Sequence, residues 1–312
     1  MTRSRAGSPP QGDEPGDPVS PDGAGPWIGV PRYREVRVIA DGGTSHIIEC
    51  EDTELGRRIA IKTARRDADA SPRVQEMLRR EARLTGQLEH PNIVPIYDAG
   101  VDARGGRYYV MRLLSQPTLE TVLGKLAAGE PDILADYSIG RLLTDFLQVC
   151  RAVDYANSCG VIHCDLKPAN ILLGRYGEVL VVDWGLAFDQ RDQTGLRGGT
   201  PGYMAPEQLD PRARLDARTD VFALGVMLYE ILSLHSPFDA DSDADVQALL
   251  RDYAAGEWGP PPPGRLRTIA VPREIEEICM CALDPDPAGR FATAGEMARG
   301  IEAAFFGHAR LP

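Results

Sequence analysis

Apolar and polar residues alternate with a period of two in the first third of the chain, which is the spacing of β-strands. Val36, Val38 and Ala40 stand two residues apart. A glycine turn follows at 41–43, and the apolar run resumes at Ile47. Further short strands are predicted at 59–62, 93–96 and 108–114. The pattern predicts a small β-rich lobe.

Helical spacing of apolar residues dominates the rest of the chain. An amphipathic helix is predicted at 72–89, with a proline in its first turn. The 3.6-residue rhythm runs through 137–158, and the segment 220–233 is apolar on nearly all sides, as expected inside a helical lobe. Two short strands are predicted at 171–173 and 179–182, and an extended connector at the four prolines 260–263.

These elements predict an α+β fold with two unequal lobes, the first mostly β and the second mostly α. We place the β-rich lobe at 31–114 and the helical lobe at 115–312. Residues 1–30 are rich in Pro, Gly, Asp and Ser, with almost nothing apolar before Trp27. Such a segment buries too little surface to offset its ordering entropy, so it is predicted to be a disordered tail.

Composition narrows the classes of function. The 312 residues are 43% hydrophobic and 26% charged, which is typical of a soluble globular protein. A formal net charge of -12 argues against nucleic-acid binding, which rewards clustered Lys and Arg. The six cysteines lack metal-binding spacing and are interpreted as reduced thiols. No membrane segment or signal peptide is predicted, and a cytoplasmic location is expected.

The candidate chemistry lies in the run HCDLKPAN at 163–170 and in Asp183, thirteen residues later. Asp165 and Asp183 supply carboxylates, Lys167 an ammonium and Asn170 an amide carbonyl. This set, at this spacing, can bind magnesium and a nucleoside triphosphate while it accepts a hydroxyl proton. The pattern therefore predicts phosphoryl transfer from ATP to an alcohol.

A lysine and a glutamate in the small lobe add to this set. Lys62 shares a strand face with Ala60, whose small side chain leaves room for a flat ring beside the ammonium. Glu81 falls in the middle of the inward stripe of the predicted helix, where a carboxylate is costly unless it is paired. The stripe consists of Val74, Leu78, Thr85 and Leu88. We therefore predict a Lys62–Glu81 ion pair.

Taken together, these residues resemble the eukaryotic-like (Hanks-type) serine/threonine protein kinases of bacteria, over about residues 33–305. The resemblance implies the bilobal protein-kinase fold, with ATP and two magnesium ions (manganese possible) in the cleft. It implies that Asp165 accepts the proton of a protein Ser/Thr hydroxyl, while Lys167 neutralises charge on the moving phosphoryl group. Asn170 and Asp183 would ligate the metal ions.

The resemblance also implies a nucleotide site in which Lys62, held by Glu81, fixes the phosphates. The adenine would lie between Ile47 and Ala60 above and Leu172 below. The implied contacts are Ile39, Ala40, Asp41, Gly42, Gly43, Thr44, Ser45, His46, Ile47, Ala60, Lys62, Met111 and Leu172. The family pattern G-x-G-x-x-G is altered here, because the first and third glycines are replaced by Ala and Ser.

The run GTPGYMAPE at 199–207 is similar to the peptide-binding loop of the family. The resemblance implies that Thr200 bonds to Asp165 and Lys167. Lys167, two residues after the catalytic Asp, follows the Ser/Thr rather than the tyrosine kinase pattern. Structural roles are implied for an ion pair between Glu207 and Arg290 and for the helix carboxylate Asp220.

Two departures from the family concern regulation and packing. Cys164 replaces an arginine that pairs with a phosphorylated loop residue in most relatives, and Thr194 is the only hydroxyl between Gly185 and Gly199. We hypothesise that activity does not require phosphorylation of this loop. Trp184 replaces the usual Phe, and a second hypothesis is that it fills space left by the small Thr85. The proposed stack is Thr85, Ile96, His163 and Trp184.

Three interpretations of the sequence compete: an active Ser/Thr protein kinase, a pseudokinase scaffold, and a small-molecule phosphotransferase. The first accommodates every ionisable position. The altered glycine loop and Cys164 favour the second, whereas the peptide-binding loop and the long helical lobe disfavour the third. The physiological substrate, the activating signal and the oligomeric state have no signature in the sequence.

Overall fold

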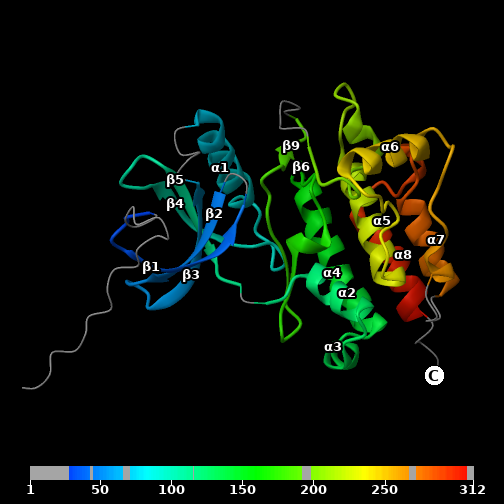
Figure 1. The fold of residues 1–312 in the computed structure, drawn as a ribbon, viewed down its shortest axis with the longest axis horizontal. Helices are drawn as coiled ribbons and strands as arrows, with labels where there is room; N and C mark the ends of the chain where they lie inside the picture. The colour runs from blue at the N-terminus through cyan, green and yellow to red at the C-terminus, as the bar shows by residue number, and fades with distance from the viewer. Residues whose placement is uncertain are drawn as a thin grey trace, which may run out of the picture.

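The computed structural model describes residues 28–42, 45–65, 71–114, 116–191, 198–266 and 272–307. Two lobes lie side by side, a β-sheet with one helix and a larger bundle of helices (Figure 1). Most of the predicted tail, and Gly43, Thr44 and Thr194, lie outside the described residues. The α+β architecture predicted from the sequence is confirmed.

The small lobe is a five-stranded antiparallel sheet in the order β1-β2-β3-β5-β4. Its strands are β1 (Tyr33–Asp41), β2 (Ser45–Asp52), β3 (Arg57–Ala64), β4 (Ile96–Val101) and β5 (Arg107–Arg112). Helix α1 (Pro72–Thr85) packs against β3, β4 and β5 through its apolar stripe. Within that stripe Glu81 is buried, as the sequence predicted. The helix thereby presents a carboxylate to the sheet.

Two β-bulges interrupt β1. Its pairing with β2 skips Val36 and Ile39, where the register shifts by one residue. Each bulge changes which side chains face which side of the sheet, so the alternation expected over Val36, Val38 and Ala40 does not persist. Val36 and Ile39 are exposed as a result.

Several boundaries differ from the sequence predictions, and three of the differences bear on the small lobe. Helix α1 ends at Thr85 rather than at 89, and Gly86 follows as its C-cap. The strand expected at 93–96 begins only at Ile96, because the backbone on either side of Ile93, at Asn92 and Val94, hydrogen-bonds to Val181 of the other lobe. Ile28, assigned to the tail, is completely buried beneath the sheet, so the packed lobe already includes this residue.

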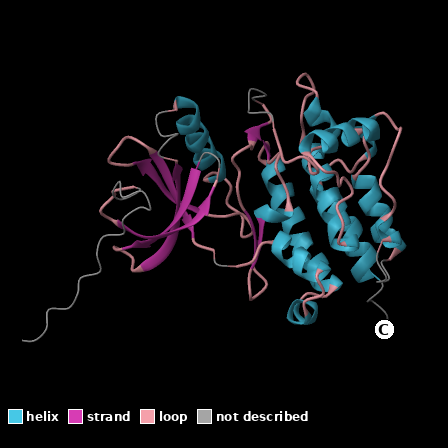
Figure 2. Cartoon of the chain, viewed as in Figure 1, coloured by secondary structure: helices cyan, strands magenta, loops and turns pink. Residues whose placement is uncertain are grey.

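The large lobe is mainly helical (Figure 2). Its helices are α2 (Leu119–Ala127), α3 (Pro131–Asp136), α4 (Ile139–Ser158), α5 (Ala217–Ser233), α6 (Asp243–Ala254), α7 (Arg273–Ala282) and α8 (Ala294–Phe306). Helix α5 contacts α4, α7 and α8 and is buried along most of its length. This explains why its sequence is apolar on nearly all sides.

Four short strands lie between α4 and α5 in sequence. They pair as β6 (Val161–Ile162) with β9 (Phe188–Asp189), and β7 (Ile171–Leu173) with β8 (Val179–Val181). The β7–β8 hairpin places Asn170 before its first strand and Asp183 just after its second. Because the two strands are antiparallel, these residues emerge at the same end of the hairpin.

The proline run at 260–263 is extended until Pro263, which starts a short 3₁₀ turn. Tyr229 of α5 donates a hydrogen bond to the carbonyl of Pro261 at 2.8 Å, which fixes this connector to the lobe. Among the described helices, none has both the length and the apolar character needed to cross a bilayer.

Candidate active site

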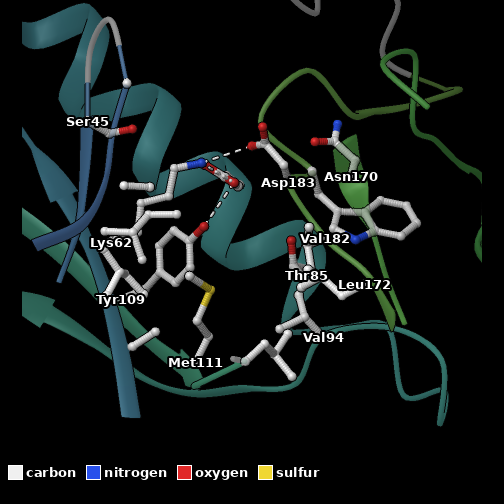
Figure 3. A pocket seen from close by; sticks show the side chains of 18 of the residues that line it. Ser45, Lys62, Thr85, Val94, Tyr109, Met111, Asn170, Leu172, Val182 and Asp183 are labelled. Atoms are coloured by element: carbon white, nitrogen blue, oxygen red, sulfur yellow. Dashed lines mark hydrogen bonds and ion pairs between the residues drawn. The ribbon is translucent and has the colours of Figure 1, made fainter. Parts of the chain in front are cut away.

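A cavity of about 350 Å³ lies between the two lobes. Of the thirteen implied nucleotide contacts, Gly43 and Thr44 lie outside the described residues, and ten of the other eleven line this cavity together with both implied metal ligands. Those that line the cavity are Ile39, Ala40, Asp41, Gly42, Ser45, Ile47, Ala60, Lys62, Met111, Asn170, Leu172 and Asp183. Figure 3 shows Lys62 and Asp183 pointing toward one another at one end of this cavity, with Met111 at the other.

His46 is the implied contact that the structure places elsewhere. In β2 buried and half-buried residues alternate, so His46 and Ile48 face the opposite side of the sheet from Ser45 and Ile47. The His46 imidazole lies 3.1 Å from the carboxylate of Asp41, outside the lining of the cavity. Assigning an unbroken run of residues to the ligand ignored the two-residue period of the strand.

Several lining residues were missed from the sequence. They are Val94, Tyr109, Arg112, Leu114, Ala169 and Val182, together with Thr85 and Trp184, which had been considered only for packing. Tyr109 stands two residues before Met111 on β5, so strand parity could have found it. Val94 reaches the cavity because its segment bonds to the large lobe, and the local sequence carries no sign of that contact.

Three charged side chains form the polar end of the cavity. The Lys62 ammonium lies 2.7 Å and 3.0 Å from the two carboxylate oxygens of Glu81. It also lies 2.9 Å from an oxygen of Asp183, which comes from the other lobe. Tyr109 donates a further hydrogen bond to Glu81 at 2.9 Å. The ion pair predicted between Lys62 and Glu81 is therefore present, and Lys62 links the two lobes.

Burial and charge act in opposite directions on these groups. Burial opposes the charged form of Lys62, but the carboxylates of Glu81 and Asp183 outweigh it and hold the pKa of Lys62 well above its usual value. Burial likewise disfavours ionisation of Asp183, yet the Lys62 ammonium keeps the pKa of that carboxyl below its usual value. Both groups are thus charged at neutral pH.

Asp165 and its neighbours form a second polar cluster in the large lobe. Asp165 accepts hydrogen bonds from the backbone N–H and the hydroxyl of Thr200, both at 2.8 Å. The Lys167 ammonium lies 2.9 Å from Asp165 and 2.6 Å from the Thr200 hydroxyl. The contacts of Thr200 expected from the sequence are present.

The two clusters border a common space. A second cavity of about 250 Å³ is lined by Asp165, Lys62, Glu81 and Asp183, and several of these residues also line the first. Asp165 is only 8% exposed, but it borders this cavity and is therefore accessible from the cleft. A group bound near Lys62 and Asp183 would lie beside Asp165.

The backbone of the loop at 163–170 is held from below by Asp220 of α5. Its two carboxylate oxygens accept the backbone N–H groups of His163 and Cys164, each at 3.0 Å. Asn157 donates a third hydrogen bond, at 2.9 Å. Cys164 has a φ of 65°, a left-handed conformation that L residues adopt only when their surroundings enforce it. The buried carboxylate supplies that constraint.

The implied metal ligands fit a hard divalent cation. Asn170 donates its amide N–H to the Asp165 carbonyl at 2.9 Å, which orients the side chain. The side chain of Asp183 is 46% exposed and keeps acceptor capacity beyond its contact with Lys62. Oxygen ligands of this type suit Mg²⁺, which takes few protein ligands beside water and phosphate. Within the described residues, no cluster of three or more His, Cys, Asp or Glu could hold a metal ion.

Two further sequence expectations concern support and packing. Arg290 forms a bidentate pair with Glu207, at 2.8 Å and 2.9 Å, and its side chain is completely buried. Trp184 is 1% exposed, and its indole contacts the His163 ring with 4.5 Å between ring centroids. Thr85 is buried and, like Trp184, reaches the wall of the cavity.

Comparisons with known proteins agree with this geometry. A family model described as protein kinase domain matches residues 33–299. The chain is 35% identical over 299 residues to a protein named serine/threonine-protein kinase PknD from Protochlamydia amoebophila, covering 86% of this chain and 29% of that protein. It is 34% identical over 285 residues to a probable serine/threonine-protein kinase, SCO3848, from Streptomyces coelicolor, covering 88% and 40%.

A third relative, a protein named PknD from Chlamydia muridarum, is 31% identical, with 87% of this chain and 31% of that protein covered. The chain therefore spans about a third of the length of these curated relatives.

Proposed function

This chain belongs to the protein kinase family, and we propose on that basis that it transfers the γ-phosphoryl group of ATP to Ser and Thr hydroxyls of proteins. One observation carries the proposal: Asp165, bonded to Thr200 and Lys167, borders the same cavity as the Lys62–Asp183 pair. A base, a phosphate-binding cation and a metal-binding carboxylate thus lie around one space.

The apolar end of the larger cavity suits a purine ring. Ile47, Ala60, Leu172 and Met111 all line this cavity, and the ring would lie between Ile47 and Ala60 on one side and Leu172 on the other, with Met111 at the rear. Burial of the ring between these side chains would leave the phosphates at the charged end. Lys62 would then donate to phosphate oxygens while Glu81 holds its ammonium in place.

The residues of the large lobe would act on the acceptor hydroxyl. Asp165 would orient the incoming Ser or Thr and accept its proton, which must leave as the new O–P bond forms. Lys167 would neutralise charge on the moving phosphoryl group, and its bond to Thr200 supports a Ser/Thr acceptor because that threonine lies in the loop resembling the family's peptide-binding loop. Positioning and charge neutralisation would supply most of the rate.

Asn170 and Asp183 would hold magnesium, which neutralises the charge of the phosphates when it is bound. Their oxygens are hard ligands at the phosphate end of the cavity. The domain is proposed to act in the cytoplasm, and six free cysteines support a reducing compartment.

The test is transfer of labelled phosphate from γ-labelled ATP to casein in the presence of Mg²⁺, followed by identification of the labelled amino acids. We expect label on Ser and Thr, and a loss of about 10³-fold in Asp183→Asn. Asp132→Asn, in the exposed helix α3, is the matched control and should transfer as the parent does. If Mg-ATP raises the melting temperature but no phosphate is transferred, the kinase proposal fails and the chain is a pseudokinase scaffold.

A further inference from the structure

Three separate segments of the chain meet at one buried amide. Gln208 lies in the 3₁₀ turn Pro206–Leu209 and is 7% exposed. Its amide N–H group donates to the carbonyl of Cys164 at 3.1 Å and to the carbonyl of Gly198 at 3.0 Å. Its amide oxygen accepts the backbone N–H of Ala205 at 2.8 Å. Both of its N–H donors and one lone pair of its oxygen are therefore used within the protein.

The two carbonyls that Gln208 binds flank residues of the site. The Cys164 carbonyl belongs to the peptide bond that leads into Asp165, and Gly198 precedes Thr200 by two residues. Asp165 and Thr200 in turn bond to each other, at 2.8 Å. Gln208 thus links the backbone on both sides of that bond, so the separation between the candidate base and the threonine depends on its side chain.

The Gln208 amide is tightly packed on the side that faces Gly199. A Cβ added at Gly199 would lie 3.2 Å from the Gln208 amide nitrogen, 3.1 Å from the Cys164 carbonyl oxygen and 2.7 Å from Met204. These distances are shorter than ordinary van der Waals contacts. Because Gly199 has no side chain, its backbone packs directly against the Gln208 amide. This close packing restricts the Gln208 side chain.

The side chain of Cys164 also connects the loop at 163–170 to the segment after Asp183, through apolar packing. It is 7% exposed and belongs to a buried cluster with Ile162, Phe188 and Leu215. Phe188 lies in β9, in the segment that follows Asp183. Position 164 therefore joins the loop at 163–170 to this segment without any charged group. Its backbone carbonyl makes the other connection, through Gln208.

We propose that Gln208 is a positioning residue that aligns Thr200 with Asp165 for the protein substrate, and that it does so without a phosphate group. The inference rests on the proposed kinase function. An amide side chain forms neutral hydrogen bonds that are independent of any modification, and leaving two buried carbonyls without donors is unfavourable. The alignment of the site is therefore built into the fold.

The experiment replaces Gln208 by glutamate, which has the same shape and can still accept from Ala205 but cannot donate to the two carbonyls. We expect kcat for casein to fall by about 10²-fold, because a displacement of about 1 Å at a catalytic group has this effect. KM for ATP should stay within about twofold, because the cavity that binds the nucleotide does not include Gln208.

Gln148→Glu is the matched control. Gln148 donates its amide to the carbonyl of Gly177 at 3.3 Å, in a part of the large lobe that lines neither cavity. This variant makes the same chemical change and should keep the kcat of the parent. If Gln208→Glu does not fold, Gln208→Met removes the same donors without adding charge and replaces it in the assay.

The results separate the two proposals. A Gln208→Glu kcat within about threefold of the parent, or equal losses in both variants, overturns the role of Gln208 and leaves the kinase function intact. If the parent itself transfers no phosphate, the kinase function fails. Hydrogen exchange of the Thr200 amide then decides the role of Gln208: faster exchange in Gln208→Glu supports it, and unchanged exchange overturns it.

Discussion

The charges that face the cleft and the charges that lie beneath it are bonded in different ways. In the cleft, Lys62 is paired with the side chains of Glu81 and Asp183, and Asp183 is 46% exposed. Beneath it, Arg290 has a completely buried side chain and bonds to three backbone carbonyls as well as to Glu207. The first set can exchange partners when a ligand arrives, whereas the second has no position left for one.

This difference shows how one fold can use one set of charged residues for catalysis and another set to stabilise the structure. Charges that bond to other mobile side chains remain available to phosphate and metal. Asp220, which bonds to the backbone beneath the loop at 163–170, and Arg290 instead fix the chain, and neither lines either of the two cavities described above. Substitutions in the first set should therefore reduce activity, and substitutions in the second should reduce stability.

The largest expected effect is on activity, at Asp165. We expect Asp165→Asn to lower kcat by about 10²- to 10⁴-fold, the usual contribution of a positioned base. The free energy of unfolding should change by no more than about 1 kcal/mol, because the amide oxygen can still accept from Thr200. Steady-state phosphotransfer and urea denaturation measure the two quantities. A variant that loses stability along with activity would contradict the separation between the two sets of charges.

The next effect is on stability, at Arg290. Arg290→Met leaves Glu207, whose side chain is only 11% exposed, without its cation, and we expect the free energy of unfolding to fall by about 3–5 kcal/mol. Urea denaturation of the variant measures this change. Arg151 forms an ion pair with Glu302 on the surface and is the matched control. Arg151→Met should cost less than about 1 kcal/mol, and equal losses in the two variants would refute the argument.

Trp184 connects the two regions, because it lines the cavity while its indole packs on His163 above Asp220. Trp184→Phe removes buried volume, and we expect a loss of about 1–2 kcal/mol in the free energy of unfolding with a lower turnover. Thermal unfolding and phosphotransfer are the measurements. An unchanged melting temperature and turnover would show that the indole is ordinary core variation.

Local patterns in the sequence predicted much of both regions. The strand parity of Ala60 and Lys62, and the position of Glu81 in a helical stripe, were enough to predict the ion pair seen at 2.7 Å. The contacts of Thr200 followed from the resemblance to a family. Both depend on short-range order along one element, or on motifs whose spacing is distinctive.

Other features had no local signal. The bulges at Val36 and Ile39 arise from pairing with β2, so the alternation within β1 alone could not reveal them. His46 was placed in the ligand site because it lies in the loop motif, although its strand turns it away. Gln208 was missed because its partners are 44 and 10 residues away in sequence. Contacts that bring distant backbone together leave no periodic pattern.

A smaller effect concerns a half-buried carboxyl that forms no ion pair with any residue the structure describes. Glu230 of α5 accepts from the Tyr203 hydroxyl at 2.9 Å, and burial raises its pKa to about 7. The folded chain therefore keeps a proton that the unfolded chain releases, so the free energy of unfolding falls as pH rises from about 4.5 to 7. Glu230→Gln should flatten this fall by at most about 1.4 kcal/mol per pH unit.

Urea denaturation at pH 5, 6, 7 and 8 measures the slopes. Asp145 contributes in the same direction, because burial raises its pKa to about 6, so some slope remains in the variant. The difference between parent and Glu230→Gln isolates the one carboxyl. Parallel curves for the two proteins would mean that Glu230 titrates alike in the folded and unfolded states.

The smallest expected effect is at Thr194, which lies outside the described residues. An arginine at position 164 could pair with a phosphorylated residue, but Cys164 instead packs against Phe188 and Leu215. Because position 164 offers a phosphate no cation, Thr194→Ala should keep kcat within about twofold of the parent. Thr200→Ala is the contrasting variant, since it removes the hydroxyl that bonds to Asp165. Loss of most activity in Thr194→Ala, measured with casein, would show that the loop needs its phosphate after all.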